Sequence, residues 1–344
     1  MSESNKRNFI VHGSILAIAG ILVRIIGMLY RIPVVNIIGS EGNGIYGAAF
    51  NIYNIMLVLS SYGLPMAVSK LVSARFTKKR YKSAAKVLRC SLMVAVCTGG
   101  IAALLVFFGA SFIENVIYGG GLPGLAVPLR ILAPTIFLVA ILGVIRGFFQ
   151  GQSTMIPTAV SQILEQIVNA IVSIAAGYGM MKAFASLPDV AAYGAAGSTL
   201  GTAMGALTAV LFMGFLYAVY TPTFNRLKRK DRHTENQSTG QICKIIIYTM
   251  IPIILGQTFY QISALIDDVM FSNIMVGRDI TKSISMDLGN FSSSYSLLIG
   301  IPQGVASAMS ASMLPSIVAS YTQGDNASVK DKIAQTIKTN MFIA

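Results

Sequence analysis

Two arginines inside the first apolar segment are the residues of this sequence best suited to chemistry. Arg24 and Arg31 lie seven residues apart in the stretch 22–33. At about 100° per residue, this spacing puts both guanidinium groups on one helix face, about 10 Å apart along the axis. An arginine near a bilayer centre costs about 2.5–3.5 kcal/mol on insertion scales, so it normally faces a bundle interior or an aqueous cavity. Because a guanidinium donates parallel hydrogen bonds to phosphate oxygens, the pair predicts a site for an anionic, phosphate-bearing ligand.

Two structural alternatives stay open for these arginines. Arg31 could extend to the outer membrane interface with its stem along the apolar surface. Arg24, which is more central in the segment, could instead form an internal ion pair. Either arrangement would satisfy the charge without a ligand.

A polar stripe marks the fifth apolar segment. Its members recur at spacings of three and four residues, which places them on one helix face turned toward protein or water: Gln162, Glu165, Gln166 and Asn169. Glu165 is a candidate partner for the first-segment arginines and lies close in depth to Arg146. A structural or gating ion pair and a role in proton or cation coupling both remain open for Glu165.

Two further groups of polar residues are candidates for binding. In the second segment Tyr46, Phe50, Tyr53 and Asn54 recur at helical spacing, with Asn51 alongside. Aromatic faces and amides commonly hold sugars, so Asn51, Tyr53 and Asn54 are predicted to face a glycan, with plain packing as the alternative. In the seventh segment Asp267 and Asp268 lie near the outer end, where they form either a solvated helix end or a coupling site.

The sequence offers little for catalysis. Its two histidines, His12 and His233, have no carboxylate or cysteine at metal-ligand spacing. The Ser/His/Asp order of a hydrolase, a phosphate-cradling glycine loop and a zinc-protease helix are all missing from the pattern. We therefore predict no catalytic residue, no metal and no cofactor.

The elements that position these residues are apolar helices. The 344 residues are 54% hydrophobic and only 11% charged, with a mean hydropathy of +0.67, whereas soluble domains are roughly a quarter charged. The pattern predicts an all-α polytopic membrane protein with a ninth helix starting near 330 and eight helices before it: 10–38, 44–72, 86–113, 126–150, 155–183, 190–220, 242–272 and 287–319. Because the chain stops early in the ninth, we expect the sequence to be part of a longer protein.

The distribution of basic residues predicts the orientation. The net charge of +13 is concentrated in alternate connections, which hold about 20 lysines and arginines. The opposite connections hold only Arg130, Lys182, Arg278 and Lys282. The positive-inside rule then places the N-terminus in the cytoplasm. The run from Arg75 to Arg89 is predicted to touch anionic lipid headgroups and not nucleic acid.

Two features describe the scaffold. Gly197, Gly201 and Gly205 form a repeated small-residue pattern, which predicts close helix packing. A weak similarity between the segments 62–69 and 312–320 suggests two repeated lobes. We predict a first lobe over 1–222 with helices one to six, a basic cytoplasmic linker over 223–240, and the start of a second lobe over 241–344.

Several motifs resemble a known family. They occupy 24–33, 62–70, 146–151 (Arg-Gly-Phe-Phe-Gln-Gly) and 157–166. They look like the polysaccharide-transporter branch of the multidrug/oligosaccharidyl-lipid/polysaccharide flippase superfamily, which includes the lipid II flippases and stage V sporulation protein B-like proteins of Gram-positive bacteria. The resemblance implies a two-lobe bundle of about fourteen helices, similar to multidrug and toxin extruders, around a central cavity. It also implies residence in the bacterial plasma membrane.

The function implied by the resemblance is alternating-access transport of a polyprenyl-diphosphate-linked sugar, above all a peptidoglycan precursor. The resemblance also implies cell-wall synthesis enzymes as partners. Arg24 falls on a diphosphate-binding position of the family, and Arg31 matches with a different spacing. The cationic positions of Gram-negative members in the second and eighth helices are not basic here.

Two other functions remain as alternatives. A cation-coupled multidrug antiporter would use Glu165, Asp267 or Asp268 as the coupling carboxylate, although the first-helix arginines would repel an organic cation. A membrane-embedded glycan polymerase or ligase would need acid and base groups at the outer face, where only aspartates are available.

Overall fold

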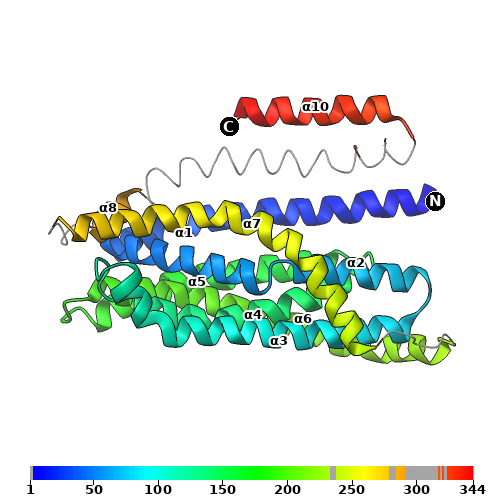
Figure 1. Cartoon of the computed structure of the whole chain (residues 1–344), viewed down its shortest axis with the longest axis horizontal. Coiled ribbons are helices and arrows are strands. Elements are labelled where there is room, and N and C mark those ends of the chain that lie inside the picture. Colours follow the sequence, from blue (N-terminus) through cyan, green and yellow to red (C-terminus); the bar gives the residue numbers. More distant parts are fainter. Residues whose placement is uncertain are drawn as a thin grey trace.

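The computed structural model describes residues 3–232, 238–278, 284–291, 317, 320 and 324–343, with side chains from residue 18 onward except at 260, 340 and 343. The chain forms the following helices: α1 (Glu3–Ser60), α2 (Leu64–Thr77), α3 (Tyr81–Phe112), the π-helical turn η1 (Ile113–Ile117), α4 (Ala126–Gly151), α5 (Ile156–Ala183), α6 (Val190–Lys230), α7 (Thr239–Val276), α8 (Ile284–Asn290) and α10 (Asn326–Ile343). Figure 1 shows α1 to α7 aligned along the long axis of one bundle, with α10 to one side.

The described residues confirm the predicted class. All of their regular elements are helices, and six described stretches are long and apolar enough to cross a membrane. The bundle exposes large apolar side chains on its outside, among them Phe108 (77% exposed), Leu211 (65%) and Phe215 (65%). Such a surface would be unfavourable in water and fits lipid tails.

Helix boundaries match the predictions in the middle of the chain and differ near both ends of the first lobe. The predicted break between 38 and 44 coincides with Gly39, whose φ of 69° interrupts α1 and is accessible to glycine at little cost. The predicted helix 44–72 is divided by a turn at 61–63, because Pro65 is suited to the first turn of α2. α6 continues to Lys230, ten residues beyond the predicted end at 220.

The predicted eighth helix, 287–319, lies mostly outside the described residues, and α8 covers only its start. The segment 312–320 that suggested a repeat lies outside them except for two positions, as do Lys282 and His233. The side chain of His12 is also outside the described set.

The buried apolar side chains form two clusters, one toward each end of the bundle. The cluster at the α8 end joins the second half of α1 to α3, α4 and α8, with Tyr46, Tyr118 and Leu129 among its fully buried members. The cluster at the α2 end joins α2, α3, α4 and α6 to the first half of α7 around Phe148 and Phe224. Between the two, α7 changes direction (Figure 1) and contains Pro252, which removes one backbone hydrogen bond.

The glycine pattern of α6 confirms the predicted close packing. A Cβ atom on Gly205 would lie 2.6 Å from the carbonyl oxygen of Glu165, and one on Gly201 would lie 2.6 Å from that of Asn169. One on Gly197 would collide with the carbonyl of Ala176. α5 therefore lies with its backbone directly against α6, which fixes the direction in which the polar stripe of α5 points.

That stripe joins α5 to α4 through an ion pair. Arg146 Nη2 lies 2.7 Å from Glu165 Oε2, and Arg146 Nε donates to Ser161 Oγ at 2.9 Å. The two side chains of the pair are 14% and 27% exposed. Of the partners predicted for Glu165, the structure places Arg146 in contact with it.

Two other residues of the stripe, Gln166 and Asn169, contact α1. Asn169 is 8% exposed and donates to the Tyr30 hydroxyl at 3.3 Å, while its own oxygen accepts from Ser173 Oγ. A Cβ atom on Gly27 would lie 3.2 Å from Gln166 Nε2, so the amide of Gln166 rests against the α1 backbone. The stripe thus holds the part of α1 that carries Arg31.

We predict that Gly201→Ala destabilises the protein by about 1–3 kcal/mol, because its methyl group would force α5 and α6 apart. The matched control is Gly214→Ala on the same helix, where nothing lies within 4 Å of the added atom. Thermal unfolding of the two variants in detergent, followed by circular dichroism, measures the difference. Equal melting temperatures would contradict the packing account.

We also predict energetic coupling between Arg146 and Glu165. Arg146→Gln and Glu165→Gln should each lower the free energy of unfolding by about 1–3 kcal/mol, since each leaves a half-buried charge without its partner. The double variant should lose less than the sum of the two, as a double-mutant cycle in detergent would reveal. Purely additive losses would show that the ion pair contributes nothing.

Candidate binding cavity

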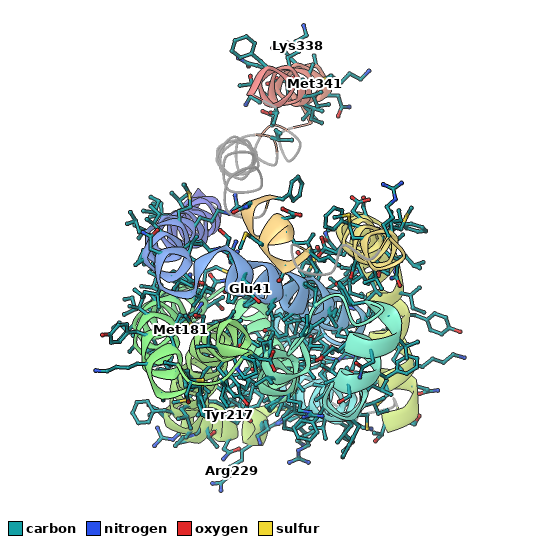
Figure 2. All side chains as sticks on the ribbon, turned by 90° about the vertical axis from the view of Figure 1, so that its left-hand side faces the viewer. Glu41, Met181, Tyr217, Arg229, Lys338 and Met341 are labelled. Carbon is teal, nitrogen blue, oxygen red and sulfur yellow. The ribbon has the colours of Figure 1, made fainter. Side chains whose placement is uncertain are left out.

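A cavity of about 470 Å³ lies between α1 and α7. Its walls are formed by residues of both halves of α1, by three residues of α7 and by Phe291 next to α8: Gly27, Tyr30, Arg31, Tyr46, Gly47, Phe50, Asn51, Asn54, Ala264, Asp267, Asp268 and Phe291. Figure 2, viewed from the α8 end, shows α8 between the first half of α1 and α7, with Glu41 beside it. The cavity therefore separates the helix that begins the predicted first lobe from the helix that begins the second.

Arg31 is the basic residue of this cavity. Its Nη2 donates to Asn43 Oδ1 at 3.1 Å, and its ζ carbon lies 4.5 Å from the centre of the Tyr46 ring. Asn43 is fully buried and in turn donates to the Gly289 carbonyl of α8 at 2.8 Å. Because the break at Gly39 redirects α1, residues that follow it can face Arg31 across the bend. The guanidinium has five N–H groups, and its contacts with Asn43 and Tyr46 engage part of them, so the rest can serve a ligand.

Close packing against α8 supports this arrangement. A Cβ atom on Gly44 would collide with the Ser285 carbonyl, and one on Gly289 would collide with the Ser40 carbonyl. The two backbones meet at these glycines, which places the Gly289 carbonyl within reach of Asn43. The position of Arg31 thus depends on glycines that carry no chemistry of their own.

The opposite wall of the cavity is acidic. Asp268 Oδ2 accepts a hydrogen bond from Asn51 Nδ2 at 2.6 Å, and Asp267 is its exposed neighbour on α7. α7 is held in place one turn further on, where Ser272 Oγ donates to the Tyr118 carbonyl at 2.8 Å and Asn273 Nδ2 donates to the Ile117 carbonyl at 2.7 Å. These bonds attach α7 to the turn after α3.

The structure brings some of the predicted binding residues together and separates others. Arg31, Asn51, Asn54 and Asp267 line the cavity. Arg24 is exposed on α1 and is not among the residues that line it.

Tyr53 is 5% exposed and packs in the apolar cluster at the α8 end, so its ring faces the core. Arg146, Glu165, Gln166 and Asn169 form the supporting stripe on α4 and α5, as described above.

Sequence reasoning missed Asn43. It lies in the run Glu41-Gly-Asn-Gly44, which has the composition of a loop, and the structure shows that it is the residue that orients Arg31. A single buried asparagine between two glycines is the signal that could have found it, because a buried amide needs a polar partner.

Comparison with known proteins supports the fold and the family. Two curated relatives from Bacillus subtilis (strain 168) match nearly the whole chain: the lipid II flippase MurJ, 28% identical over 337 residues (96% of this chain, 61% of the relative), and stage V sporulation protein B, 25% identical over 336 residues (97% and 62%). The chain spans about three fifths of the length of these relatives.

Solved structures with the same fold include the inward-facing conformation of a multidrug resistance MATE family transporter of the MOP superfamily, with a TM-score of 0.67 at 14% identity over 97% of this chain and 71% of that one. The outward-facing conformation of such a transporter has a TM-score of 0.65 at 16% identity over 100% and 73%. The chain thus has a MATE-like helical fold. The family model described as "Polysaccharide biosynthesis protein" matches residues 10–320, and the chain belongs to that family.

Proposed function

We propose that this protein carries a polyprenyl-diphosphate-linked oligosaccharide from the inner to the outer leaflet of the bacterial plasma membrane by alternating access. The substrate we favour is lipid II or a related cell-wall glycan carrier, since one relative is named a lipid II flippase. The observation that carries the proposal is the guanidinium of Arg31, held by Asn43 and Tyr46 in a cavity between α1 and α7.

The chemistry of the cavity suits such a headgroup. The free N–H groups of Arg31 can donate two parallel bonds to a diphosphate, whose oxygens carry charge at every relevant pH. The half-buried ring of Phe50, which packs 4.5 Å from the Tyr46 ring between centroids, and the amide of Asn54 offer an aromatic face and a polar group to a sugar. The polyprenyl tail is too apolar for this cavity and stays in the bilayer.

Arg24 provides a second diphosphate-binding position on the proposed transport path. It lies on the same helix seven residues before Arg31, or about 10 Å nearer the N-terminus of α1. With the N-terminus in the cytoplasm, a diphosphate entering from the inner leaflet meets Arg24 first and Arg31 second. Movement between the lobes then requires exchange of the few hydrogen bonds that join α7 to the first lobe, such as the one between Asn51 and Asp268.

We predict that Arg31→Gln weakens binding of a polyprenyl-diphosphate sugar about 10- to 100-fold, because it removes charge-assisted bonds worth about 1.5–3 kcal/mol. Arg31→Lys should be intermediate, since it keeps the charge but loses the planar fork. Native mass spectrometry of the complete gene product in mild detergent measures the binding.

The matched control is Arg130→Gln, an exposed arginine that contacts Ser111 outside the cavity. Wild-type affinity in Arg31→Gln would contradict the proposal. Organic-cation binding that persists or improves in Arg31→Gln, without any diphosphate binding to the wild type, would favour a cation-coupled multidrug antiporter instead.

The proposed orientation is tested by labelling. In a cysteine-free background, Lys78→Cys after α2 should resist a membrane-impermeant maleimide in intact cells and react after permeabilisation. Ser186→Cys, between α5 and α6, should react in both conditions because it lies at the opposite end of an odd number of spans. Both residues are exposed. The reverse pattern would place the N-terminus outside.

A further inference from the structure

The cavity contains groups of opposite charge that do not pair with each other. Arg31 lies on the α1 side, and Asp267 and Asp268 lie on the α7 side. Arg146 and Glu165, on α4 and α5, form an ion pair, whereas Arg31 forms none with Asp267 or Asp268 in the described structure. The guanidinium is instead held by Asn43 and Tyr46, and Asp268 by Asn51. The cavity is thus built with separated positive and negative walls.

This separation matters once an anion enters. The guanidinium of Arg31 and the carboxylates of Asp267 and Asp268 together give the cavity a formal charge of −1. A diphosphate at Arg31 adds further negative charge, and like charges repel strongly where protein and lipid replace water. A ligand that brings only a diphosphate and neutral sugars would leave the two carboxylates uncompensated. A ligand that also carries a positive group would compensate the charge of these carboxylates.

We infer that Asp267 and Asp268 bind an ammonium group on the headgroup of the lipid-linked glycan while Arg31 binds its diphosphate. The inference rests on the proposed function and adds a substrate class to it: a carrier-linked glycan with a free amine, on an amino sugar or on an attached peptide. The protein distinguishes this substrate from a neutral glycan by the charge on the α7 wall.

The geometry suits an ammonium better than a small inorganic cation. Asp267 and Asp268 are consecutive on a helix, so their side chains diverge by about 100° and do not converge on one small ion. An ammonium can bind one of the two carboxylates directly while the second adds negative charge at longer range, whereas a small inorganic cation needs several oxygen ligands at once, which these two divergent carboxylates do not provide. The cavity of about 470 Å³ also has room for a sugar-sized group beside the carboxylates. The bond from Asn51 to one oxygen of Asp268 leaves its second oxygen without a hydrogen bond in the described structure.

The test compares two forms of one ligand. A polyprenyl-diphosphate sugar with a free amine is measured beside its N-acetylated form, which keeps the diphosphate and loses the positive charge. We expect the wild type to bind the acetylated form about tenfold more weakly, equivalent to about 1.4 kcal/mol. Asp267→Asn with Asp268→Asn should bind both forms equally, whereas Glu41→Gln, an exposed carboxylate outside the cavity, should keep the preference.

The two Asp→Asn substitutions are expected to preserve the fold. Asparagine at 268 retains an oxygen that can accept from Asn51, and Asp267 is exposed, so Asp267→Asn alone provides a second, milder variant. Size-exclusion chromatography and circular dichroism in detergent verify the fold. The milder variant should show a reduced preference between the two ligands.

The outcomes separate this inference from the proposed function. Equal, Arg31-dependent binding of both forms by the wild type would overturn the inference and leave the proposed function intact. Binding of neither form would overturn both. A third outcome is that the wild type shows no preference for the free-amine form and binds either form only with sodium. If the Asn variants abolish this sodium dependence, the carboxylates bind an inorganic cation and the inference is wrong.

Discussion

A guanidinium inside an apolar bundle must have its charge and its donors satisfied by the protein, and much of this structure follows from how that is done for Arg31. Lipid offers no hydrogen bonds, so an unsatisfied polar group there costs several kcal/mol. Asn43 and Tyr46 meet part of this requirement from the same helix, because α1 breaks at Gly39 and brings them back toward Arg31. Asn43 in turn depends on the Gly289 carbonyl of α8. The position of Arg31 is therefore fixed by the part of α1 after Gly39 and, through Asn43, by α8.

The position of α1 depends in turn on its contacts with α5 and on the packing of α5 against α6. The half of α1 that carries Arg31 rests on α5 through Tyr30 and Gly27, and α5 is fixed by α6 at three glycines. Glycine is required at these places because another residue would collide with a carbonyl oxygen of the facing helix. In a bilayer, where apolar surfaces gain little from leaving lipid, such close backbone packing is the principal source of helix association. In the proposed alternating-access cycle, α7 would move against this closely packed first lobe.

Much of the fold follows from the sequence, and the site follows only in part. Long apolar segments and the small-residue pattern of α6 predict the membrane bundle and its closest helix pair, because both depend on local composition. The run Arg226–Lys230 was predicted as linker from its charge, but lysine, arginine and leucine are good helix formers, and α6 continues through it. The pairing of Glu165 with Arg146 needed the structure, since three arginines were within plausible depth.

For the binding cavity, the sequence predicts some lining residues and not others. Helical periodicity puts Arg24 and Arg31 on one face, yet only Arg31 lines the cavity, since the cavity begins where α1 bends and α7 crosses. Periodicity likewise grouped Tyr53 with Tyr46 and Phe50. Tyr46 and Tyr53 are both buried in the same apolar cluster, and the cavity lining includes Tyr46 and Phe50 but not Tyr53.

The central claim is that Arg31 receives the diphosphate of a lipid-linked glycan. The most direct measurement is a cryo-electron microscopy structure of the complete gene product with a polyprenyl-diphosphate sugar bound. The account predicts density for the diphosphate within hydrogen-bonding distance of the Arg31 guanidinium, with the sugar toward Phe50, Asn54 and the α7 wall. Density for the headgroup outside the cavity between α1 and α7, with Arg31 still bound only to Asn43 and Tyr46, would contradict it.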